Sequence, residues 1–317
     1  MLTLLRERIA SGSRPGARQD DCKLGLAIEG GGMRGVVSCG MADELARRGG
    51  YDAFDTVYGT SAGAFIGSFF TTRQMHLGPS VYIDDLPNSQ FIAWRRLFLG
   101  RPVVNLHFLI NEGRLRIKPL DWRRVVSSAV PLKIVVSSLH HGDARLLHDF
   151  QSESDLFEAL RGSATVPYLA GLPVPYHGDM LFDGGIFEPF PYQSAITDGC
   201  THVVVLSSRP QGRYCRPPAP LISRIVERRL RRLSPATANA SSHDPLHYKH
   251  AAQHIDTASL HPGIAPFIYG AHLAHDVREI SRLEKNRTKP RAGAAVIAGL
   301  LPTAKPLTVL SALSTAR

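Results

Sequence analysis

Three short glycine-rich segments contain the residue types that acyl transfer requires. Ser61 stands in the pentapeptide Gly59-Thr60-Ser61-Ala62-Gly63, and glycines on both sides of a serine suit a strained strand-to-helix turn that presents the hydroxyl to a ligand. Asp183 precedes two glycines, a turn that suits a carboxylate base brought up to that hydroxyl. Residues 29–35 form an upstream glycine loop whose backbone amides suit an oxyanion. Together the three segments predict a serine acyl hydrolase.

The surroundings of Ser61 strengthen this interpretation beyond the bare pattern. A GxSxG match arises readily by chance in a chain with 28 glycines. Here the match follows a short apolar strand and precedes a segment rich in Ala, Gly and Phe, where small residues allow the turn to close. A helix that begins after Ser61 directs free amides and a positive dipole end toward the serine. The glycines that we expect to support the two turns are Gly59, Gly63, Gly184 and Gly185.

The upstream loop has two interpretations. The same residues match GxGxxG, and Asp55 follows about 20 residues later, as in dinucleotide-binding proteins. Asp55 nevertheless precedes the second predicted strand, whereas the ribose-binding acid belongs at the end of that strand. The sequence therefore favours an oxyanion loop over a nucleotide site. Its candidate members are Gly30, Gly31, Gly32, Met33, Arg34 and Gly35, with Gly31, Gly32 and Arg34 as the preferred donors.

The elements around these segments predict an α/β fold. Residues 23–29 alternate and then run apolar into the glycines, as a buried parallel strand does, and residues 35–48 have helical spacing. A second strand and helix follow at 55–58 and 61–72. This repetition of strand, glycine turn and helix indicates parallel βαβ units. Further strands are expected at 132–139, 144–150 and 202–207, and further helices at 152–161 and 191–198.

The three segments resemble the signature blocks of the patatin-like phospholipase family, in the same order along the chain: Glu29-Gly30-Gly31-Gly32-Met33-Arg34-Gly35, then Gly59-Thr60-Ser61-Ala62-Gly63, then Asp183-Gly184-Gly185. The resemblance is to a bacterial-type acyl hydrolase and covers residues 23–208. It implies a three-layer α/β/α sandwich with a mainly parallel central sheet. It also implies a Ser–Asp dyad in place of a triad, with Ser61 as nucleophile and Asp183 as base, and neither a metal nor an organic cofactor.

The expected reaction is hydrolysis of carboxylic ester bonds in phospholipids or lysophospholipids through an acyl-enzyme. A catalytically inactive lipid- or membrane-binding protein of the same fold is one alternative. A Ser-His-Asp esterase is another, and its histidine would be His202, His243 or His247. The histidines between residues 243 and 254 stand at near-helical spacing, but no carboxylate or cysteine partner is apparent. A polar helix face therefore explains them better than a metal site.

Segment composition predicts how the chain is divided. Residues 94–99 suggest either a lid, a lipid-facing element or core packing, and core packing is favoured. Residues 221–233 predict an amphipathic helix, whose arginines fit a solvated face better than a contact with anionic lipid. Residues 234–242 have the composition of a flexible linker. The expected regions are an N-terminal tail (1–22), a patatin-like catalytic core (23–208) and a basic, helical C-terminal extension that packs on the core (209–317).

A formal net charge of +10 and a pI near 9.7 favour anionic partners. Aromatic and basic residues do not interleave as they do in a nucleic-acid groove, so we expect peripheral contact with acidic membrane lipids and no nucleic acid. No apolar run approaches the roughly 18–20 residues that span a bilayer, and the N-terminus lacks the apolar core of a secretory signal. These features predict a cytoplasmic protein, and they indicate no particular oligomeric state. Reduced thiols are expected for Cys22, Cys39, Cys200 and Cys215, which show no CxxC spacing.

Overall fold

A mainly parallel sheet forms the centre of the protein. The computed structural model describes residues 2–110, 118–214, 220–260, 267–272 and 288–301, and within these ranges eight strands make one sheet in the order β5-β6-β3-β2-β1-β7-β8, with β4 beside β3. Pairing is parallel from β3 through β2, β1 and β7 to β8, and antiparallel in β3–β4, β3–β6 and β5–β6. The strands are β1 (Leu24–Ile28), β2 (Thr56–Thr60), β3 (Leu132–Ser138), β4 (Ala144–Leu147), β5 (Val174–Tyr176), β6 (Asp179–Asp183), β7 (His202–Leu206) and β8 (Phe267–Ala271).

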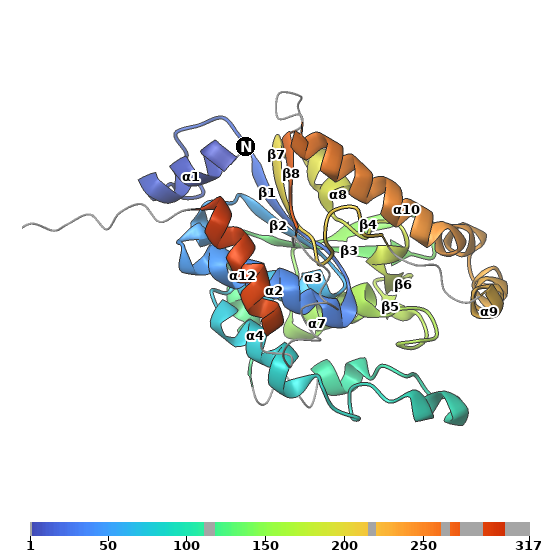
Figure 1. Ribbon diagram of the computed structural model, residues 1–317. Helices are drawn as coiled ribbons and strands as arrows, with labels where there is room; N and C mark the ends of the chain where they lie inside the picture. Colours follow the sequence, from blue (N-terminus) through green and yellow to red (C-terminus); the bar gives the residue numbers. More distant parts are fainter. Residues whose placement is uncertain (1, 111–117, 215–219, 261–266, 273–287, 302–317) are drawn as a thin grey trace, which may run out of the picture.

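Helices cover both faces of this sheet (Figure 1). One face carries α2 (Gly35–Arg47), α3 (Ala62–Thr71), α7 (Glu153–Ala164) and α12 (Thr288–Leu300), and in Figure 1 the red α12 lies along the blue α2. The opposite face carries α8 (Tyr192–Thr197) and α10 (Pro235–Leu260). The shorter elements are α1 (Leu2–Ser11), α4 (Gly78–Ser80), α6 (Trp122–Val126), α9 (Pro220–Leu230), η1 (Gly32–Arg34), η2 (Gly50–Asp52), η3 (Met75–Leu77), η4 (Val81–Asp85), η5 (Trp94–Leu99) and η7 (Gly184–Ile186).

The residues of strand β1 are suited to the middle of the sheet. All five of its residues are buried, as in a parallel strand that is covered on both faces. Leu24, Leu26 and Ile28 pack into the core under α2 and α3. Ala27 points to the other side, into the core beneath α8 and α10. The expected three-layer α/β/α sandwich with a mainly parallel sheet is confirmed.

The N-terminal region differs from the frayed tail that the sequence suggested. Helix α1 packs against η2, Leu5 joins the hydrophobic core, and the guanidinium of Arg8 is buried. Arg8 donates to Asp20 and to Asp55 at 2.6 and 2.7 Å. This ion-pair network, invisible to local patterns, ties the helix to the amino ends of β1 and β2.

The C-terminal extension also differs from expectation in one part. The segment 234–242, predicted to be a linker, is mostly the beginning of the 26-residue helix α10. Pro235 stands at the first position of that helix, where a missing N–H costs nothing, and several alanines follow. In the extension, α10 packs on the sheet through Tyr248, Ala252 and Ile255, and β8 adds a strand beside β7.

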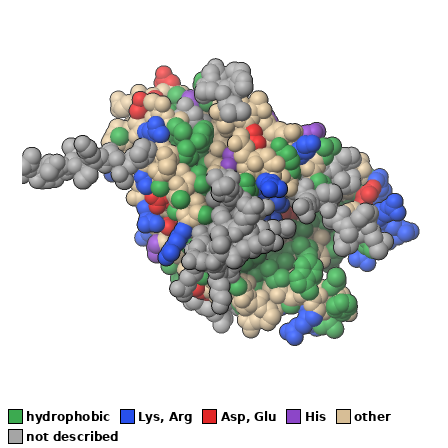
Figure 2. Space-filling view, in the orientation of Figure 1, with side chains coloured by type: hydrophobic (Ala, Val, Ile, Leu, Met, Phe, Trp, Pro, Cys, Tyr) green, Lys and Arg blue, Asp and Glu red, His purple; other side chains and the backbone are tan. Residues whose placement is uncertain are grey.

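The segment at 94–99 does not pack into the core, which corrects the favoured prediction. It forms the short helix η5, and Phe98 is 90% exposed. Figure 2 shows hydrophobic side chains gathered at the lower right of the molecule, where the teal part of the chain projects in Figure 1. Apolar composition alone did not distinguish a core segment from a projecting one.

Candidate active site

Ser61 occupies the tight turn between β2 and α3. Its backbone has φ 54° and ψ −122°, a strained conformation for a residue with a side chain. The glycines on either side make the turn feasible. A Cβ at Gly59 would overlap the Cα of Ala64, and a Cβ at Gly63 would overlap the carbonyl oxygen of Ile28. The turn therefore seats the first residues of α3 directly against β1 and presents Ser61 beyond the carboxyl end of β2.

Asp183 ends strand β6 and is held in a defined orientation. Its backbone N–H donates to the carbonyl of Thr165 at 2.9 Å, and its own carbonyl accepts from the hydroxyl of Ser137 at 2.7 Å. One carboxylate oxygen accepts from the N–H of Gly185 at 2.8 Å, so the first glycines after Asp183 form the expected turn. The residue is 6% exposed. A buried carboxylate fixed in this way is pre-oriented for proton transfer.

The sheet brings these two residues into register. Strand β3 lies between β2 and β6, with Thr60 opposite Val135 and Val136 opposite Asp183. Extending the register by one residue places Ser61 in the same row as Asp183. Two strand spacings separate the backbones of the row, about 10 Å. The register thus brings residues 122 positions apart in the sequence to the same edge of the sheet.

A second connection between the two residues runs through the end of α7. The N–H of Ser61 donates to the hydroxyl of Ser163 at 2.8 Å, and that hydroxyl donates to the carbonyl of Val135 at 2.7 Å. Two residues later, Thr165 accepts the hydrogen bond from Asp183 described above. Ser163 is fully buried. No sequence pattern indicates this residue, because a lone serine near a helix end belongs to no motif.

The glycine loop after β1 forms η1 and leads directly into α2. Three of its six candidate N–H groups already have acceptors: Gly30 donates to Pro189 at 3.2 Å, Arg34 to Gly31 at 3.1 Å, and Gly35 to Gly32. Within the described residues, the N–H groups of Gly31, Gly32 and Met33 make no hydrogen bond. The loop therefore offers those three donors, whereas the N–H of Arg34, one of the three preferred donors, is bonded to Gly31 in this structure.

A buried carboxylate anchors the base of this loop. Glu29 accepts from Tyr248 Oη at 2.8 Å, from Ser207 Oγ at 3.0 Å and from the N–H of Ser208. Burial, and then the neighbouring Glu29 carboxylate, raise the pKa of Tyr248, so its hydroxyl stays a donor. Tyr248 belongs to α10, so the C-terminal extension supports the loop directly. No local signal in the sequence indicates this contact.

An apolar cavity of about 150 Å³ opens beside Ser61. Gly32, Met33, Ser61 and Ala62 line one end, so the loop and the serine border the same space. Most of the remaining wall is aliphatic or aromatic, with contributions from α3, η4 and the segments 91–92 and 104–109. A hydrocarbon chain is the ligand that such a wall favours. Asp183 is not among the lining residues.

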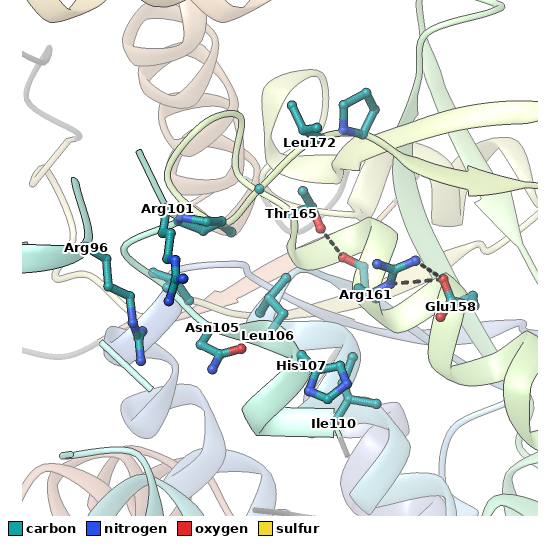
Figure 3. A pocket seen from close by; sticks show the side chains of 15 residues that line it. Arg96, Arg101, Asn105, Leu106, His107, Ile110, Glu158, Arg161, Thr165 and Leu172 are labelled. Atoms are coloured by element: carbon teal, nitrogen blue, oxygen red, sulfur yellow. Dashed lines mark hydrogen bonds and ion pairs between the residues drawn. The ribbon is translucent and has the colours of Figure 1, made fainter. Parts of the chain in front are cut away.

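A larger cavity of about 700 Å³ adjoins the first and shares Val104, Leu106 and Ala170 with it. Figure 3 shows Arg96 and Arg101 on one side of this cavity and Arg161 on the other, where Arg161 pairs with Glu158 at 2.9 Å. Three guanidinium groups and one carboxylate thus border the space next to the apolar cavity. This arrangement suits an anionic group attached to an apolar chain.

The histidines considered for a triad lie elsewhere. His202 begins β7 opposite Leu24, at the end of the sheet away from Ser61. His247 lines a separate cavity with Tyr192 and His254, and Ser61 does not border that cavity. The side chain of His243 lies outside the described residues. Among the described residues, no group of three or more His, Cys, Asp or Glu side chains is arranged to hold a metal ion.

Comparison with known proteins finds one matching family and several relatives. The family model for the patatin-like phospholipase matches residues 26–196, more than half of the chain. The uncharacterized protein YjjU of Escherichia coli is 26% identical over 198 residues, which are 62% of this chain and 54% of that protein. Lysophospholipase NTE1 of Candida albicans is 27% identical over 193 residues, 58% of this chain and 13% of that protein. Human 1-acylglycerol-3-phosphate O-acyltransferase PNPLA3 is 25% identical over 104 residues, 32% of this chain and 21% of that protein.

The chain thus spans about half, or less, of the length of these relatives. The matched region contains the glycine loop, the Ser61 turn and Asp183, and it ends before β7. Most strands of the central sheet lie within it. The chain belongs to the patatin-like phospholipase family.

Proposed function

We propose that the protein is a serine lipid acyl hydrolase that uses Ser61 as nucleophile and Asp183 as base. The observation that carries the proposal is the strained turn at Ser61, which borders an apolar cavity together with Gly32 and Met33. Backbone strain at a residue with a side chain is retained where function requires it. The shared register of Ser61 and Asp183 supports the pairing.

In the proposed cycle, Ser61 Oγ attacks the carbonyl carbon of the ester and its proton passes to the carboxylate of Asp183. The oxyanion accepts hydrogen bonds from the free N–H groups of the loop, where one such donor contributes about 3 kcal/mol. Collapse breaks the ester C–O bond, and the departing alkoxide takes the proton from Asp183. Water then attacks the acyl-enzyme as its proton passes to Asp183. Collapse of this second intermediate breaks the bond between the acyl carbon and Ser61 Oγ, the serine takes the proton back from Asp183, and the acid is released. Neither a metal nor an organic cofactor takes part.

The proposed substrates are phospholipids or lysophospholipids. The apolar cavity fits an acyl chain, and the arginines of the adjoining cavity fit an anionic headgroup. The name of the Candida albicans relative, a lysophospholipase, is consistent with this class. A net charge of +10 supports access to lipids at anionic surfaces. No helix in the described part of the chain is both long and apolar enough to cross a bilayer, and we propose a peripheral mode of contact.

We propose that residues 23–208 carry out catalysis and that the extension from residue 209 supports the active site. Tyr248 is the extension's contribution, through its hydrogen bond to Glu29.

Ester hydrolysis by Ser61→Ala tests the proposal. We expect hydrolysis of a lysophospholipid to fall by about 10⁴-fold or more, because the nucleophile is removed. Ser68→Ala is the matched control, since Ser68 is a buried serine of the same helical segment whose hydroxyl bonds only to Phe65 of its own turn. That variant should retain wild-type turnover. A wild-type protein that binds lipid but cleaves no ester would instead support the inactive lipid-binding protein.

A further inference from the structure

Helix η5 exposes four large apolar side chains within six residues. Trp94, Leu97, Phe98 and Leu99 are 67%, 60%, 90% and 68% exposed. A single exposed leucine needs no explanation, but a contiguous apolar patch on a folded protein usually marks a contact surface. The patch is therefore a candidate interface.

The backbone beneath η5 holds this segment in a defined shape. Ala93 donates to the carbonyl of Val103 at 3.0 Å, and Asn105 donates to that of Phe91 at 2.8 Å, so the two arms of the projection pair at its base. The guanidinium of Arg96 reaches back and donates to four carbonyl oxygens, those of Ser89, Gln90, Phe91 and Val103, at 2.7–3.3 Å. The projection is thus pre-organised, and its apolar side chains are presented to the outside.

A neighbouring loop extends the apolar surface. Val104 donates to the carbonyl of Leu169 at 3.0 Å, which joins the projection to the loop of residues 166–172. Leu172 of this loop is 73% exposed. In the same loop, the guanidinium carbon of Arg229 lies over the ring of Tyr168, 5.3 Å from the ring centroid. Helix α9 therefore adjoins this surface. We call η5, the loop 166–172 and α9 together the docking face (Figure 2).

Arginines frame the apolar side chains of the docking face. Arg95 lies within η5 and Arg101 shortly after it; both are exposed, and neither forms an ion pair with any residue that the structure describes. Around α9, Arg231 pairs with Glu227, while the other arginines have no carboxylate partner among the described residues. The exposed arginines of this segment are Arg224, Arg228, Arg229, Arg231 and Arg232.

We propose that the docking face binds the surface of an anionic phospholipid bilayer. Trp94, Leu97, Phe98 and Leu99 enter the interfacial region of the bilayer, where tryptophan is especially favoured, while the arginines contact lipid phosphates. A second copy of the chain fits this face poorly, because pairing two such faces would bring arginines against arginines.

The docking face is also connected to the site beside Ser61. Phe91, Ile92 and Val104, at the base of the projection, line the apolar cavity. Docking of the tip therefore brings the cavity to the level of the lipid headgroups. Only this positioning of the cavity for catalysis rests on the proposed function, since binding to the bilayer needs no catalysis.

Tryptophan fluorescence tests the insertion directly. The chain has two tryptophans, so Trp122→Phe leaves Trp94 as the sole reporter. Vesicles of phosphatidylcholine with phosphatidylglycerol should shift its emission to the blue, and brominated acyl chains should quench it. Pure phosphatidylcholine vesicles should produce a much smaller change. No shift with anionic vesicles, or the same shift on raising protein concentration without lipid, would overturn the proposal, the latter in favour of self-association.

Vesicle co-sedimentation in the Ser61→Ala background separates binding from hydrolysis. The double variant Leu97→Glu/Phe98→Glu should lower the partition coefficient for anionic vesicles about tenfold or more, because two side chains lose apolar burial and acquire charge. Val126→Glu/Leu246→Glu is the control: it adds the same charge at two other exposed apolar side chains, which are 48% and 46% exposed on α6 and α10. Its partition coefficient should fall far less. Equal losses in both double variants would show that charge alone, rather than the docking face, sets binding.

Discussion

The two ends of strands β1 and β2 differ in how completely their polar groups are satisfied. At the amino ends, Arg8 is 2% exposed and donates to Asp20, Asp55 and two backbone carbonyls. At the carboxyl ends, Ser61 has a strained backbone, and Nε of Arg34 is buried without a hydrogen-bond partner among the described residues. About 16 Å, the length of a five-residue strand, separates the two ends.

The amino ends are stabilised by satisfied polar groups, whereas the carboxyl ends retain backbone strain and unused hydrogen-bond donors. The buried guanidinium of Arg8, paired with two partly exposed carboxylates, joins α1 to the sheet, since an unpaired buried charge would be costly. Unsatisfied donors and a strained turn persist at the other end, where a ligand could use them. Substitutions at the two ends should therefore separate loss of activity from loss of stability.

The largest effect is expected at the carboxyl end, from Asp183→Asn. Turnover should fall by about 10²–10⁴-fold, because asparagine cannot accept the proton of Ser61. The amide oxygen can still accept from Gly185, so Tm should change by no more than about 3 °C. Steady-state kinetics and thermal unfolding of the same preparation check both parts. Near-wild-type turnover would favour a histidine as the base.

Arg8→Met at the amino end should give the reverse pattern. The free energy of unfolding should fall by about 3 kcal/mol, because Asp20 and Asp55 lose their buried partner. The kcat at a temperature where the variant is folded should stay near that of the wild type. Urea denaturation measures the first quantity, with Arg14→Met, an exposed arginine of the same region, as control. Equal stability of the two variants would contradict the role of the network.

Ser163→Ala removes the hydroxyl that links the backbone of Ser61 to strand β3, and it should lower both activity and stability modestly. The N–H of Ser61 loses its acceptor and the carbonyl of Val135 its donor, which costs about 1–2 kcal/mol of stability. Misplacement of Ser61 should lower kcat more than it changes KM. Ser80→Ala removes a hydroxyl bonded within its own turn and is the matched control. An unchanged kcat would make Ser163 a purely structural residue.

The smallest expected effect is a pH-dependent change in stability that involves Asp198. Burial alone would raise its pKa, but hydrogen bonds from Lys133, Tyr58 and Lys23 lower it to about 2. Because the pKa is below its ordinary value of 3.8, this carboxylate stabilises the folded state fully above about pH 4 and loses that effect as pH falls toward about 2. The stability difference between the wild type and Asp198→Asn, from urea denaturation, should shrink across this window. A difference that is constant from pH 6 to pH 2.5 would contradict the assigned pKa.

Local patterns in the sequence were sufficient for the elements that hold the site. The apolar run of β1 and the glycines around Ser61 each depend on neighbours a few residues away, so β1, β2 and α3 were predicted within one or two residues of their bounds. The strand expected at 144–150 ends three residues earlier, at Leu147, and β5 and β8 were not predicted. The assignment of roles to Ser61 and Asp183 remains a prediction that the experiments above test.

Long-range contacts were beyond the reach of these patterns. The hydrogen bond from Tyr248 to Glu29 joins residues 219 positions apart, and that between Ser61 and Ser163 joins residues 102 positions apart. Segment 94–99 was predicted to be core because an inward apolar segment and a projecting one have the same composition. Only the pairing at the base of the projection distinguishes them.

Covalent labelling is the most direct test of whether Ser61 is the nucleophile. A fluorophosphonate reacts with an activated serine, and peptide mapping by mass spectrometry locates the adduct. We expect one adduct per chain, on the peptide that contains Ser61, strongly reduced in Asp183→Asn and absent in Ser61→Ala. An adduct on another serine, or an active protein that does not label, would contradict this role of Ser61.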